Sequence, residues 1–280
     1  MEICKSLEGL RAFQSVTRAA GRSLALIPTM GALHAGHLSL VKAAQNDGHA
    51  TLVTIFVNPT QFAAHEDLAT YPRRFEADLA ALETLQVDAL FAPTADVLYP
   101  VGEQTRVALS PLGQLWEGVD RPHFFDGVAT VVAKLLILSR ATAAYFGEKD
   151  FQQLQIIRRL ATDLLIDTQI IGCPTLRTAG GLALSSRNAY LQPAACQSAT
   201  ALYQALCEAR DQIRKGAAIP AVLDYAKAQV LQAGFTQVSY LAHVDAQTLA
   251  AVPTALPAGS GRLIAAAYLE GVRLIDNLAL

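Results

Sequence analysis

The sequence predicts an α/β fold: a doubly wound, mostly parallel sheet followed by a smaller α+β domain. Three observations predict it. Short apolar runs alternate with helical patterns through the first two-thirds of the 280 residues. After about residue 175 this alternation stops, and two long helical patterns precede two or three strands. Apolar residues make up 52% of the chain and charged residues 16%, which is enough apolar surface for a large core and argues against disorder.

In residues 1–175, five apolar runs predict buried strands: Leu24–Ile27, Ala50–Val57, Ala89–Ala92, Ala143–Phe146 and Thr168–Gly172. Four segments with apolar residues at helical spacing lie between or after them: Leu38–Gln45, Phe75–Gln86, Val128–Leu138 and Phe151–Leu164. Because strand and helix alternate, we expect the strands to be parallel and the helices to cover both faces, as in a Rossmann-like domain.

Residues 176–280 form the second predicted domain. The polar segment Thr175–Gly181 near its start is interpreted as a hinge, and Pro253–Gly261 as a loop. The predicted elements are two helices, Ala195–Lys215 and Ala221–Ala233, and the strands Val238–Val244, Leu263–Tyr268 and Val272–Leu274. Helices grouped before strands are typical of an α+β domain rather than of a continued parallel sheet.

Charge and cysteine content exclude several classes of protein. The net charge is -2 and no block of Lys or Arg occurs, so we expect no nucleic-acid partner. No apolar stretch is long enough to span a bilayer, so we expect no membrane partner. The N-terminus carries charged residues instead of the apolar region of a signal peptide. The four cysteines have no Cys-x-x-Cys spacing, which favours reduced thiols and a cytoplasmic protein.

The segment Pro28–His37 is the most informative part of the chain, because two histidines and two glycines stand between a predicted strand and a predicted helix. The carboxyl ends of parallel strands bind ligands, and the N–H groups that begin a helix attract phosphate. His34 and His37 are three residues apart and would share one helix face, while Gly31 and Gly36 would let the backbone approach a nucleotide. The alternative is a helix-capping turn with two partly buried histidines.

Two other segments follow strands and would reach the same edge of the sheet. Asn58 and Gln61 come directly after the second strand, and a neutral amide can bind a hydroxyl and a carboxylate together. The alternative is an Asn-Pro turn with an exposed glutamine. Lys149 begins a helix, where a cation is disfavoured unless an anion binds beside it. Asp150 could be an ordinary N-terminal acidic residue, and Gln153 lies one turn further on.

Two loops complete the predicted cleft. Leu184–Asn188 contains two serines and an arginine, a set of donors that suits a triphosphate. The polar segment Ala63–Arg74 lacks clear periodicity and is a candidate lid over the cleft.

The pattern His34-x-Gly-His37 resembles that of the nucleotidyltransferases related to class I aminoacyl-tRNA synthetases. Over nearly its full length the chain resembles the pantothenate synthetase family, the pantoate–β-alanine ligases. The segments that carry this resemblance are Pro28–His37, Asn58–Phe62, Tyr71–Arg73, Gly147–Gln153, Gly181–Arg187 and Arg273–Asn277.

The resemblance implies an amide-forming ligase of pantothenate biosynthesis that condenses (R)-pantoate with β-alanine at the expense of ATP. Pantoate would first form a pantoyl-adenylate and release pyrophosphate, and the amine of β-alanine would then displace AMP. It further implies Mg²⁺ as cofactor and a homodimer. Since the substrate carboxylate is itself the nucleophile, the residues align the reactants and stabilise charge.

Carried over residue by residue, the resemblance implies that His37, His34, Lys149 and Arg187 are catalytic, with His37 as the proton-donor histidine. The implied ATP-binding residues are Met30, Gly31, Ala32, Leu33, His34, Ala35, Gly36, His37, Gly147, Glu148, Lys149, Asp150, Leu176, Leu184, Ser185, Ser186 and Arg187. Pantoate and β-alanine would contact Gln61, Gln153 and Asn58, near the pocket wall formed by Val131 and Val132. We expect phosphates to hold most of the metal, with Asp78 as a candidate ligand.

The chain departs from the family pattern at two places. Phe124 stands where the family usually has histidine, and His123 where it usually has glycine, so we expect His123 to replace the missing group in part. Gly180 replaces an aspartate before Gly181. Two other functions stay open from the sequence: another adenylyltransferase of the same fold, and a nucleotide sensor without turnover.

Overall fold

The computed structural model describes residues 1–63, 66 and 68–280. These residues form two compact units. The first contains Met1–Gln114, Arg121–Glu148 and Gln153–Pro174, and the second Leu115–Asp120, Lys149–Gln152 and Thr175–Leu280. No helix in the described part of the chain has the length and apolar character needed to cross a bilayer. The division into domains at residue 175 stays a prediction.

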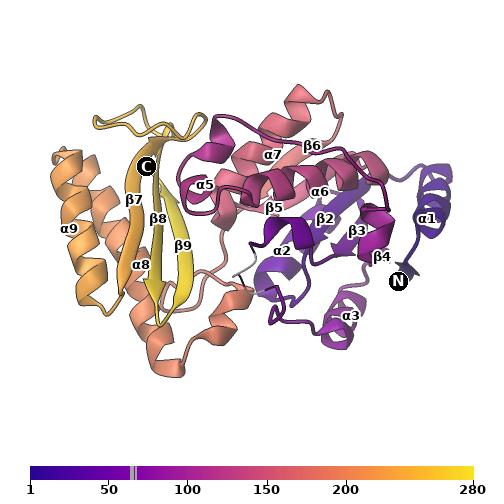
Figure 1. Cartoon of the computed structure of the whole chain (residues 1–280), viewed down its shortest axis with the longest axis horizontal. Helices are drawn as coiled ribbons and strands as arrows, with labels where there is room; N and C mark the ends of the chain where they lie inside the picture. Colours follow the sequence, from indigo (N-terminus) through magenta and orange to yellow (C-terminus); the bar gives the residue numbers. More distant parts are fainter. Residues whose placement is uncertain (64–65, 67) are drawn as a thin grey trace. The chain divides into compact units, whose positions relative to one another are not determined.

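The first unit contains a parallel sheet of six strands (Figure 1). The strands are β1 (Glu2–Cys4), β2 (Leu24–Thr29), β3 (Ala50–Ile55), β4 (Ala89–Phe91), β5 (Ala143–Gly147) and β6 (Gln169–Cys173). They lie in the order β1-β4-β3-β2-β5-β6, and each neighbouring pair is parallel. The predicted doubly wound α/β fold is therefore confirmed.

Helices cover both faces of this sheet. The longer helices are α1 (Leu7–Ala19), α2 (Ala35–Asn46), α3 (Phe75–Thr84), α6 (Phe124–Ser139) and α7 (Phe151–Asp163). The short ones are η1 (Pro59–Gln61), α4 (Ala95–Leu98) and η2 (Leu112–Gln114). Two further short helices, α5 (Glu117–Asp120) and η3 (Glu148–Asp150), belong wholly or mostly to the second unit. Buried residues of α1, α6 and α7 join one core cluster, and those of α2 and α3 join the other.

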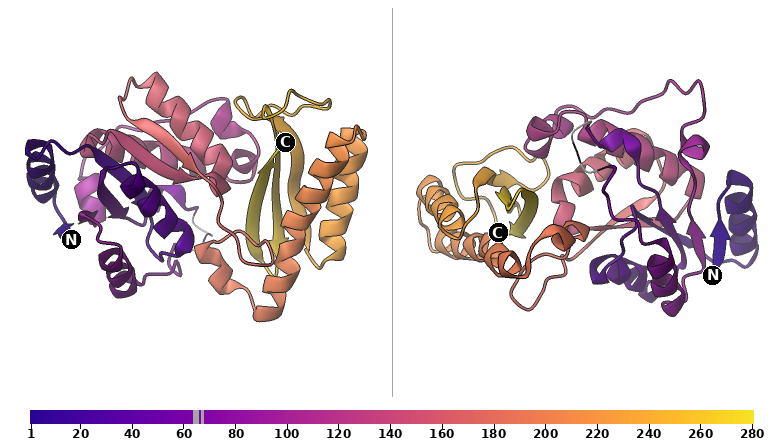
Figure 2. Two further views of the ribbon diagram at one scale, coloured as in Figure 1. Left: turned by 180° about the vertical axis from the view of Figure 1, so that it is seen from behind. Right: turned by 60° about the horizontal axis from the view of Figure 1, so that its bottom comes forward.

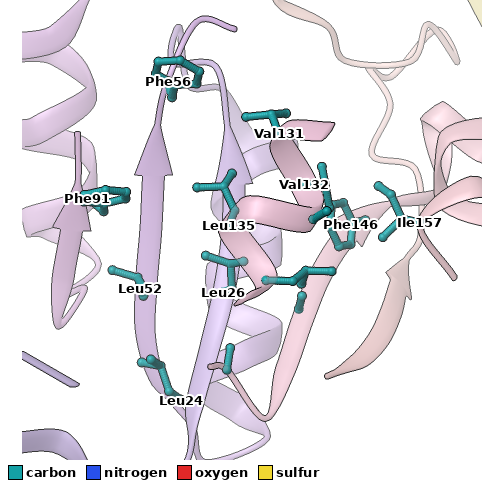
Figure 3. Packing of buried hydrophobic residues seen from close by; sticks show 14 of the residues in the cluster. Leu24, Leu26, Leu52, Phe56, Phe91, Val131, Val132, Leu135, Phe146 and Ile157 are labelled. Atoms are coloured by element: carbon teal, nitrogen blue, oxygen red, sulfur yellow. The ribbon is translucent and has the colours of Figure 1, made fainter. Parts of the chain in front are cut away.

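The side chains of β2 alternate between the two faces of the sheet, and this alternation explains the two core clusters. Leu24 and Leu26 pack on the α6 face, whereas Ala25 and Ile27 pack on the α2 face, because successive side chains of a strand point to opposite faces. Figure 3 shows Leu26 and Val131 in the α6 cluster. A strand with both faces covered needs apolar residues throughout, which is why the sequence reads as continuous apolar runs.

The second unit has an antiparallel sheet packed on two long helices (Figure 2). Its elements are η4 (Ser186–Tyr190), α8 (Pro193–Arg214), α9 (Ile219–Gln232), β7 (Gln237–Asp245), β8 (Gly261–Leu269) and β9 (Val272–Ala279). Glu270 and Gly271 form the two-residue turn between β8 and β9, and both have positive φ (+49° and +76°), as hairpin turns that match the strand twist require. The predicted smaller α+β part is confirmed.

Candidate active site

Three of the predicted segments follow three adjacent strands of the first unit. Pro28–His37 spans the end of β2, Asn58 follows β3, and Gly147 ends β5. Since β3, β2 and β5 are neighbours and parallel, their carboxyl ends meet at one edge of the sheet. The chain leaves β2 towards β3 and later returns to β5 on the other side, so the order reverses between β2 and β5. Ligands of open α/β sheets bind at such a switch point.

The turn after β2 has an unusual backbone. Gly31 has φ +80° and Ala32 has φ +50°, both in the left-handed region. A non-glycine residue is costly there, by about 1–2 kcal/mol. The buried carboxylate of Asp78 on α3 accepts hydrogen bonds from the N–H groups of Ala32 (2.9 Å) and Leu33 (2.7 Å). Asp78 thereby fixes the turn that precedes the two histidines.

His34 and His37 form a reciprocal cap at the start of α2. The N–H of Gly36 donates to Nδ1 of His34 (3.1 Å), and the N–H of His34 donates to Nδ1 of His37 (3.4 Å). The two ring centroids are 4.1 Å apart. A backbone N–H can only donate, so Nδ1 is the acceptor in both rings and the neutral rings carry their proton on Nε2. Capping and catalysis are therefore compatible, because they use different atoms of each ring.

Asn58 lies at the centre of a buried hydrogen-bond network. Its Nδ2 donates to Oε1 of Gln61 and to the carbonyl oxygen of Gly127, each at 3.1 Å. Its Oδ1 accepts from the hydroxyl groups of Tyr99 (2.8 Å) and Thr60 (3.0 Å). Burial is the largest effect on the pKa of Tyr99 and raises it, so this phenol stays protonated and donates. Asn58 thus acts within the protein and positions Gln61.

Gln61 is 8% exposed, so the alternative of an exposed glutamine in a turn is wrong. Its Nε2 lies 3.1 Å from Sδ of Met30, which links the segment after β3 to the segment after β2. Gly127 on α6 makes this arrangement possible. A Cβ at that position would lie 2.4 Å from the carbonyl oxygen of Thr60, so only glycine lets α6 approach η1. Sequence reasoning missed Gly127 and Tyr99, because neither stands in a recognisable motif.

The departure from the family pattern at Phe124 has a structural explanation. The guanidinium of Arg121 lies 3.8 Å from the centre of the Phe124 ring. Arg121 also pairs with Glu66 at 2.6 Å and donates to the carbonyl oxygen of Gln61 at 3.3 Å. His123 is exposed and makes no side-chain cap at the start of α6. Phe124, rather than His123, therefore supports this loop, through Arg121.

Part of the candidate lid Ala63–Arg74 can be located. Ala64, His65 and Asp67 lie outside the described residues. Tyr71 is buried and packs edge-on against Phe62. A lid function for this segment stays a prediction.

Lys149 lies in η3, directly before α7, as predicted, and belongs to the second unit. Its Nζ is 3.6 Å from the carboxylate of Asp150, and its side chain is 19% exposed. Its carbonyl oxygen accepts a hydrogen bond of 2.8 Å from Nδ2 of Asn277 on β9. Gln153, Glu148 and Gly147 belong to the first unit and are half-buried, and a Cβ on Gly147 would meet nothing within 4 Å.

The serine–arginine segment begins η4 in the second unit. The N–H of Arg187 donates to Oγ of Ser185 at 3.3 Å, so Ser185 caps the short helix. Upstream, Leu184 donates its N–H to the carbonyl oxygen of Leu176 at 2.9 Å. Gly181 has φ +99°, and a Cβ there would lie 2.6 Å from the Tyr203 ring. These contacts define the path of the chain through Leu176–Arg187, where Gly180 replaces the usual aspartate, and a hinge at Thr175–Gly181 stays a prediction.

The described residues were searched for side chains that could bind the expected metal ion. No group of three or more His, Cys, Asp or Glu side chains among them could hold a metal ion. Both oxygens of Asp78 already accept backbone hydrogen bonds. Asp78, the candidate metal ligand, therefore uses both carboxylate oxygens to hold the turn after β2.

Comparison with known proteins identifies the family. The model of the pantoate-beta-alanine ligase family matches residues 2–279. The chain belongs to this family. Pantothenate synthetases of Cereibacter sphaeroides and Rhizorhabdus wittichii are 49% and 48% identical to it, over 99% and 100% of the chain and 98% of each relative. The family resemblance predicted from the motifs is thus confirmed, and the chain is a ligase.

Solved structures of family members share the whole fold. The pantothenate synthetase of Thermus thermophilus is 41% identical, with a TM-score of 0.93 and coverage of 100% of this chain and 99% of that one. A pantoate-beta-alanine ligase of Francisella tularensis, complexed with beta-gamma ATP and beta-alanine, is 34% identical, with a TM-score of 0.81 and coverage of 100% and 97%.

Proposed function

We propose that the chain condenses (R)-pantoate with β-alanine to pantothenate through a pantoyl-adenylate, with release of AMP and pyrophosphate. The observation that carries this proposal is the His34–His37 turn at the switch point of the sheet, in a chain that matches the ligase family from residue 2 to residue 279. The turn supplies backbone N–H groups and two imidazoles where phosphates bind in such folds.

The reaction has two steps. A carboxylate oxygen of pantoate attacks the α-phosphorus of ATP, and the bond from that phosphorus to the bridging oxygen of pyrophosphate breaks. The amine of β-alanine then attacks the acyl carbon, the acyl–phosphate bond breaks, and AMP leaves as the nitrogen loses a proton. Negative charge grows on phosphate oxygens in the first step. His37, with its proton on Nε2, donates a hydrogen bond to such an oxygen, and His34 assists it.

Two cations offset the repulsion between the pantoate carboxylate and the triphosphate. Lys149 acts as a point charge, and Arg187 as a planar fork that suits phosphate. The proposed ATP-binding residues include backbone groups of Met30–His37, Gly147–Asp150, Leu176 and Leu184–Arg187. Glycine at 147 leaves room for close approach of the nucleotide, because a Cβ there would meet nothing within 4 Å.

The amide of Gln61 binds pantoate and β-alanine, because it can donate to a carboxylate and accept from a hydroxyl or an ammonium. Gln153 also contacts pantoate. Asn58 belongs to this site as the residue that holds Gln61 in place by a 3.1 Å hydrogen bond. Val131 and Val132, which are 6% and 5% exposed, provide the apolar wall for the methyl groups of pantoate.

Mg²⁺ is the proposed cofactor, held mainly by ATP phosphates. When bound, it neutralises phosphate charge and lowers the barrier to attack. We also propose a homodimer. The four cysteines are not joined in disulfides, which supports a reducing, cytoplasmic location.

Isotope exchange between pyrophosphate and ATP tests this function. We expect exchange that requires pantoate and Mg²⁺ but not β-alanine. Exchange without pantoate, or only with a phosphorylated substrate, would point to another adenylyltransferase of this fold. Binding of ATP with no exchange at all would identify a nucleotide sensor. For the dimer, light scattering at micromolar concentration should give twice the chain mass.

A further inference from the structure

Two adjacent polar residues in the middle of β9 are almost fully buried. Asp276 is 5% exposed and Asn277 is 4% exposed, and neither has an assigned role in ligand binding. Successive residues of a strand point to opposite faces, so the two side chains leave β9 in different directions. Burial of a carboxylate and an amide is costly unless their hydrogen bonds are satisfied, so their partners show what they hold.

Asn277 holds the segment that contains Lys149. Its Nδ2 donates to the carbonyl oxygen of Lys149 at 2.8 Å, and its Oδ1 accepts from Nε of Arg262 on β8 at 2.7 Å. The guanidinium of Arg262 lies 3.7 Å from the centre of the Phe151 ring. Residues 149 and 151 are therefore fixed at two points by the same pair of strands. This explains why Lys149–Gln152 belongs to the second unit, although it lies between β5 and the body of α7 in sequence.

Asp276 holds the segment that leads to Arg187. Its carboxylate makes two hydrogen bonds with Arg177, at 2.6 and 2.8 Å. Arg177 lies 3.7 Å above the Tyr203 ring and also donates to the carbonyl oxygen of Gly181 at 3.1 Å. Ala183 pairs with Arg177 in an isolated β-bridge, so the chain is fixed just before Leu184–Arg187 begins.

We propose that Asp276 and Asn277 are positioning residues of the adenylation step: one strand sets the two cationic segments, Lys149 and Leu184–Arg187, with respect to each other. The inference rests on the proposed roles of Lys149 and Arg187. A misplacement of about 1 Å at a reacting phosphate costs a large factor in rate, so one rigid anchor for both segments has a direct catalytic consequence. A merely structural role would instead change stability alone.

Asn277→Asp isolates the contact with Lys149. The carboxylate keeps an acceptor for Arg262 but loses the donor to the Lys149 carbonyl. We expect the KM for ATP to rise about tenfold, the loss of one buried hydrogen bond, while the KM for β-alanine changes less than about twofold. His243→Ala is the matched control, because His243 is 2% exposed on β7 and its ring lies 2.8 Å from the carbonyl oxygen of Val252. It should lower the melting temperature with KM for ATP unchanged.

A double-mutant cycle separates positioning from general destabilisation. In a Lys149→Ala background, Asn277→Asp should change the pyrophosphate exchange rate less than about twofold, because the side chain it positions is gone. Asp276→Asn should behave in the same way in an Arg187→Ala background. If a variant at β9 does not fold, two other variants replace it in the cycle: Arg262→Lys, which loses the guanidinium stacked on Phe151, and Arg177→Lys, which loses the paired hydrogen bonds to Asp276.

Full additivity in both cycles, or an unchanged KM for ATP in folded Asn277→Asp, would overturn the inference. These results are distinguishable from failure of the proposed function. If Lys149→Ala and Arg187→Ala exchange pyrophosphate at the normal rate, the proposed catalytic roles are wrong and the positioning roles fall with them. If both variants lose exchange but the β9 variants do not, only the positioning roles are wrong.

Discussion

The carboxylate of Asp78 accepts a 2.9 Å hydrogen bond from the backbone N–H of Ala32, a residue held at φ +50°. The other carboxylate oxygen accepts a hydrogen bond of 2.7 Å from the N–H of Leu33. Hydrogen bonds to a charged acceptor contribute about 1.5–3 kcal/mol, which offsets the cost of the left-handed alanine. A buried charge on α3 thus sets the direction in which the chain enters α2 and presents His34 and His37.

Asp78→Asn should therefore disturb the turn. The amide keeps one acceptor but sets an N–H₂ group against a backbone N–H, so we expect a loss of about 1–3 kcal/mol in unfolding free energy and a fall of about tenfold in exchange rate. Glu76→Gln, an exposed change of the same kind on the same helix, should do neither. If Asp78 instead binds the metal, excess Mg²⁺ will restore the rate of the variant; a turn defect will persist at any Mg²⁺ concentration.

His37 offers a test that separates capping from catalysis. Asparagine places an acceptor where Nδ1 of His37 lies, so His37→Asn should keep the cap on the His34 N–H and the melting temperature. It lacks the Nε2 donor, and we expect kcat to fall about 10²–10³-fold, the usual cost of one transition-state donor. His37→Gln, which carries a donor near the Nε2 position, should retain more activity than His37→Asn.

Thermal denaturation and steady-state kinetics of the two variants provide the check. If His37 only caps the helix, both variants should be nearly as active as the parent chain, and His37→Gln should be the less stable of the two.

The sequence predicted the elements that carry the site because they follow local rules. Apolar runs located β2, β3 and β5, whereas the switch point between β2 and β5 follows from the order of the strands in the sheet, which the sequence did not predict. The first residues were harder to interpret. Glu2–Cys4 is a three-residue edge strand, too short for a clear alternation, and two of the four buried residues of α1 are the polar residues Gln14 and Thr17.

Contacts between distant residues could not be predicted. Asp78 was a candidate metal ligand, because nothing local shows that its oxygens reach residues 32 and 33, 45 or more positions away. Gly127 appears in sequence as one glycine in an apolar helix, yet it is the contact that lets η1 approach α6. The roles of Asp78 and Gly127 come from contacts in the tertiary structure, and no local sequence pattern indicates them.

Stability should depend on pH through Asp88. Burial alone would raise the pKa of Asp88, but hydrogen bonds from Arg22 (2.6 Å) and from the N–H of Thr51 (2.8 Å) outweigh it and hold the pKa below its usual value. A lowered folded-state pKa stabilises the fold above the unfolded-state value of about 4, and this stabilisation is lost as the pH falls through the folded-state pKa.

Asp88→Asn should consequently lower the unfolding free energy by about 1 kcal/mol at pH 7, a modest value because Arg22 is half exposed, and by clearly less at pH 3. Urea denaturation at both pH values measures the difference. Asp163→Asn, in an exposed pair with Arg159, should change little at either pH. An equal loss for Asp88→Asn at both pH values would show that the charge is not responsible.

Phe124, which stands where the family usually has histidine, should affect substrate binding rather than turnover. Its ring supports Arg121, and Arg121 holds the carbonyl oxygen of Gln61. Phe124→Ala removes that support, so we expect the KM for pantoate to rise about three- to tenfold with kcat nearly unchanged, in line with a cation–π contribution of about 0.5–1 kcal/mol and a displaced Gln61. Phe124→His keeps an aromatic ring under the guanidinium and should retain a KM close to that of the parent chain.

His123→Ala should alter neither kcat nor the KM for pantoate, because His123 is exposed and Phe124 fills the supporting role. Kinetics of the three variants at saturating ATP decide between the two residues. A large fall in kcat for His123→Ala, at unchanged KM and melting temperature, would mean that the loop takes part in the reaction and that Phe124 has not replaced the family's histidine.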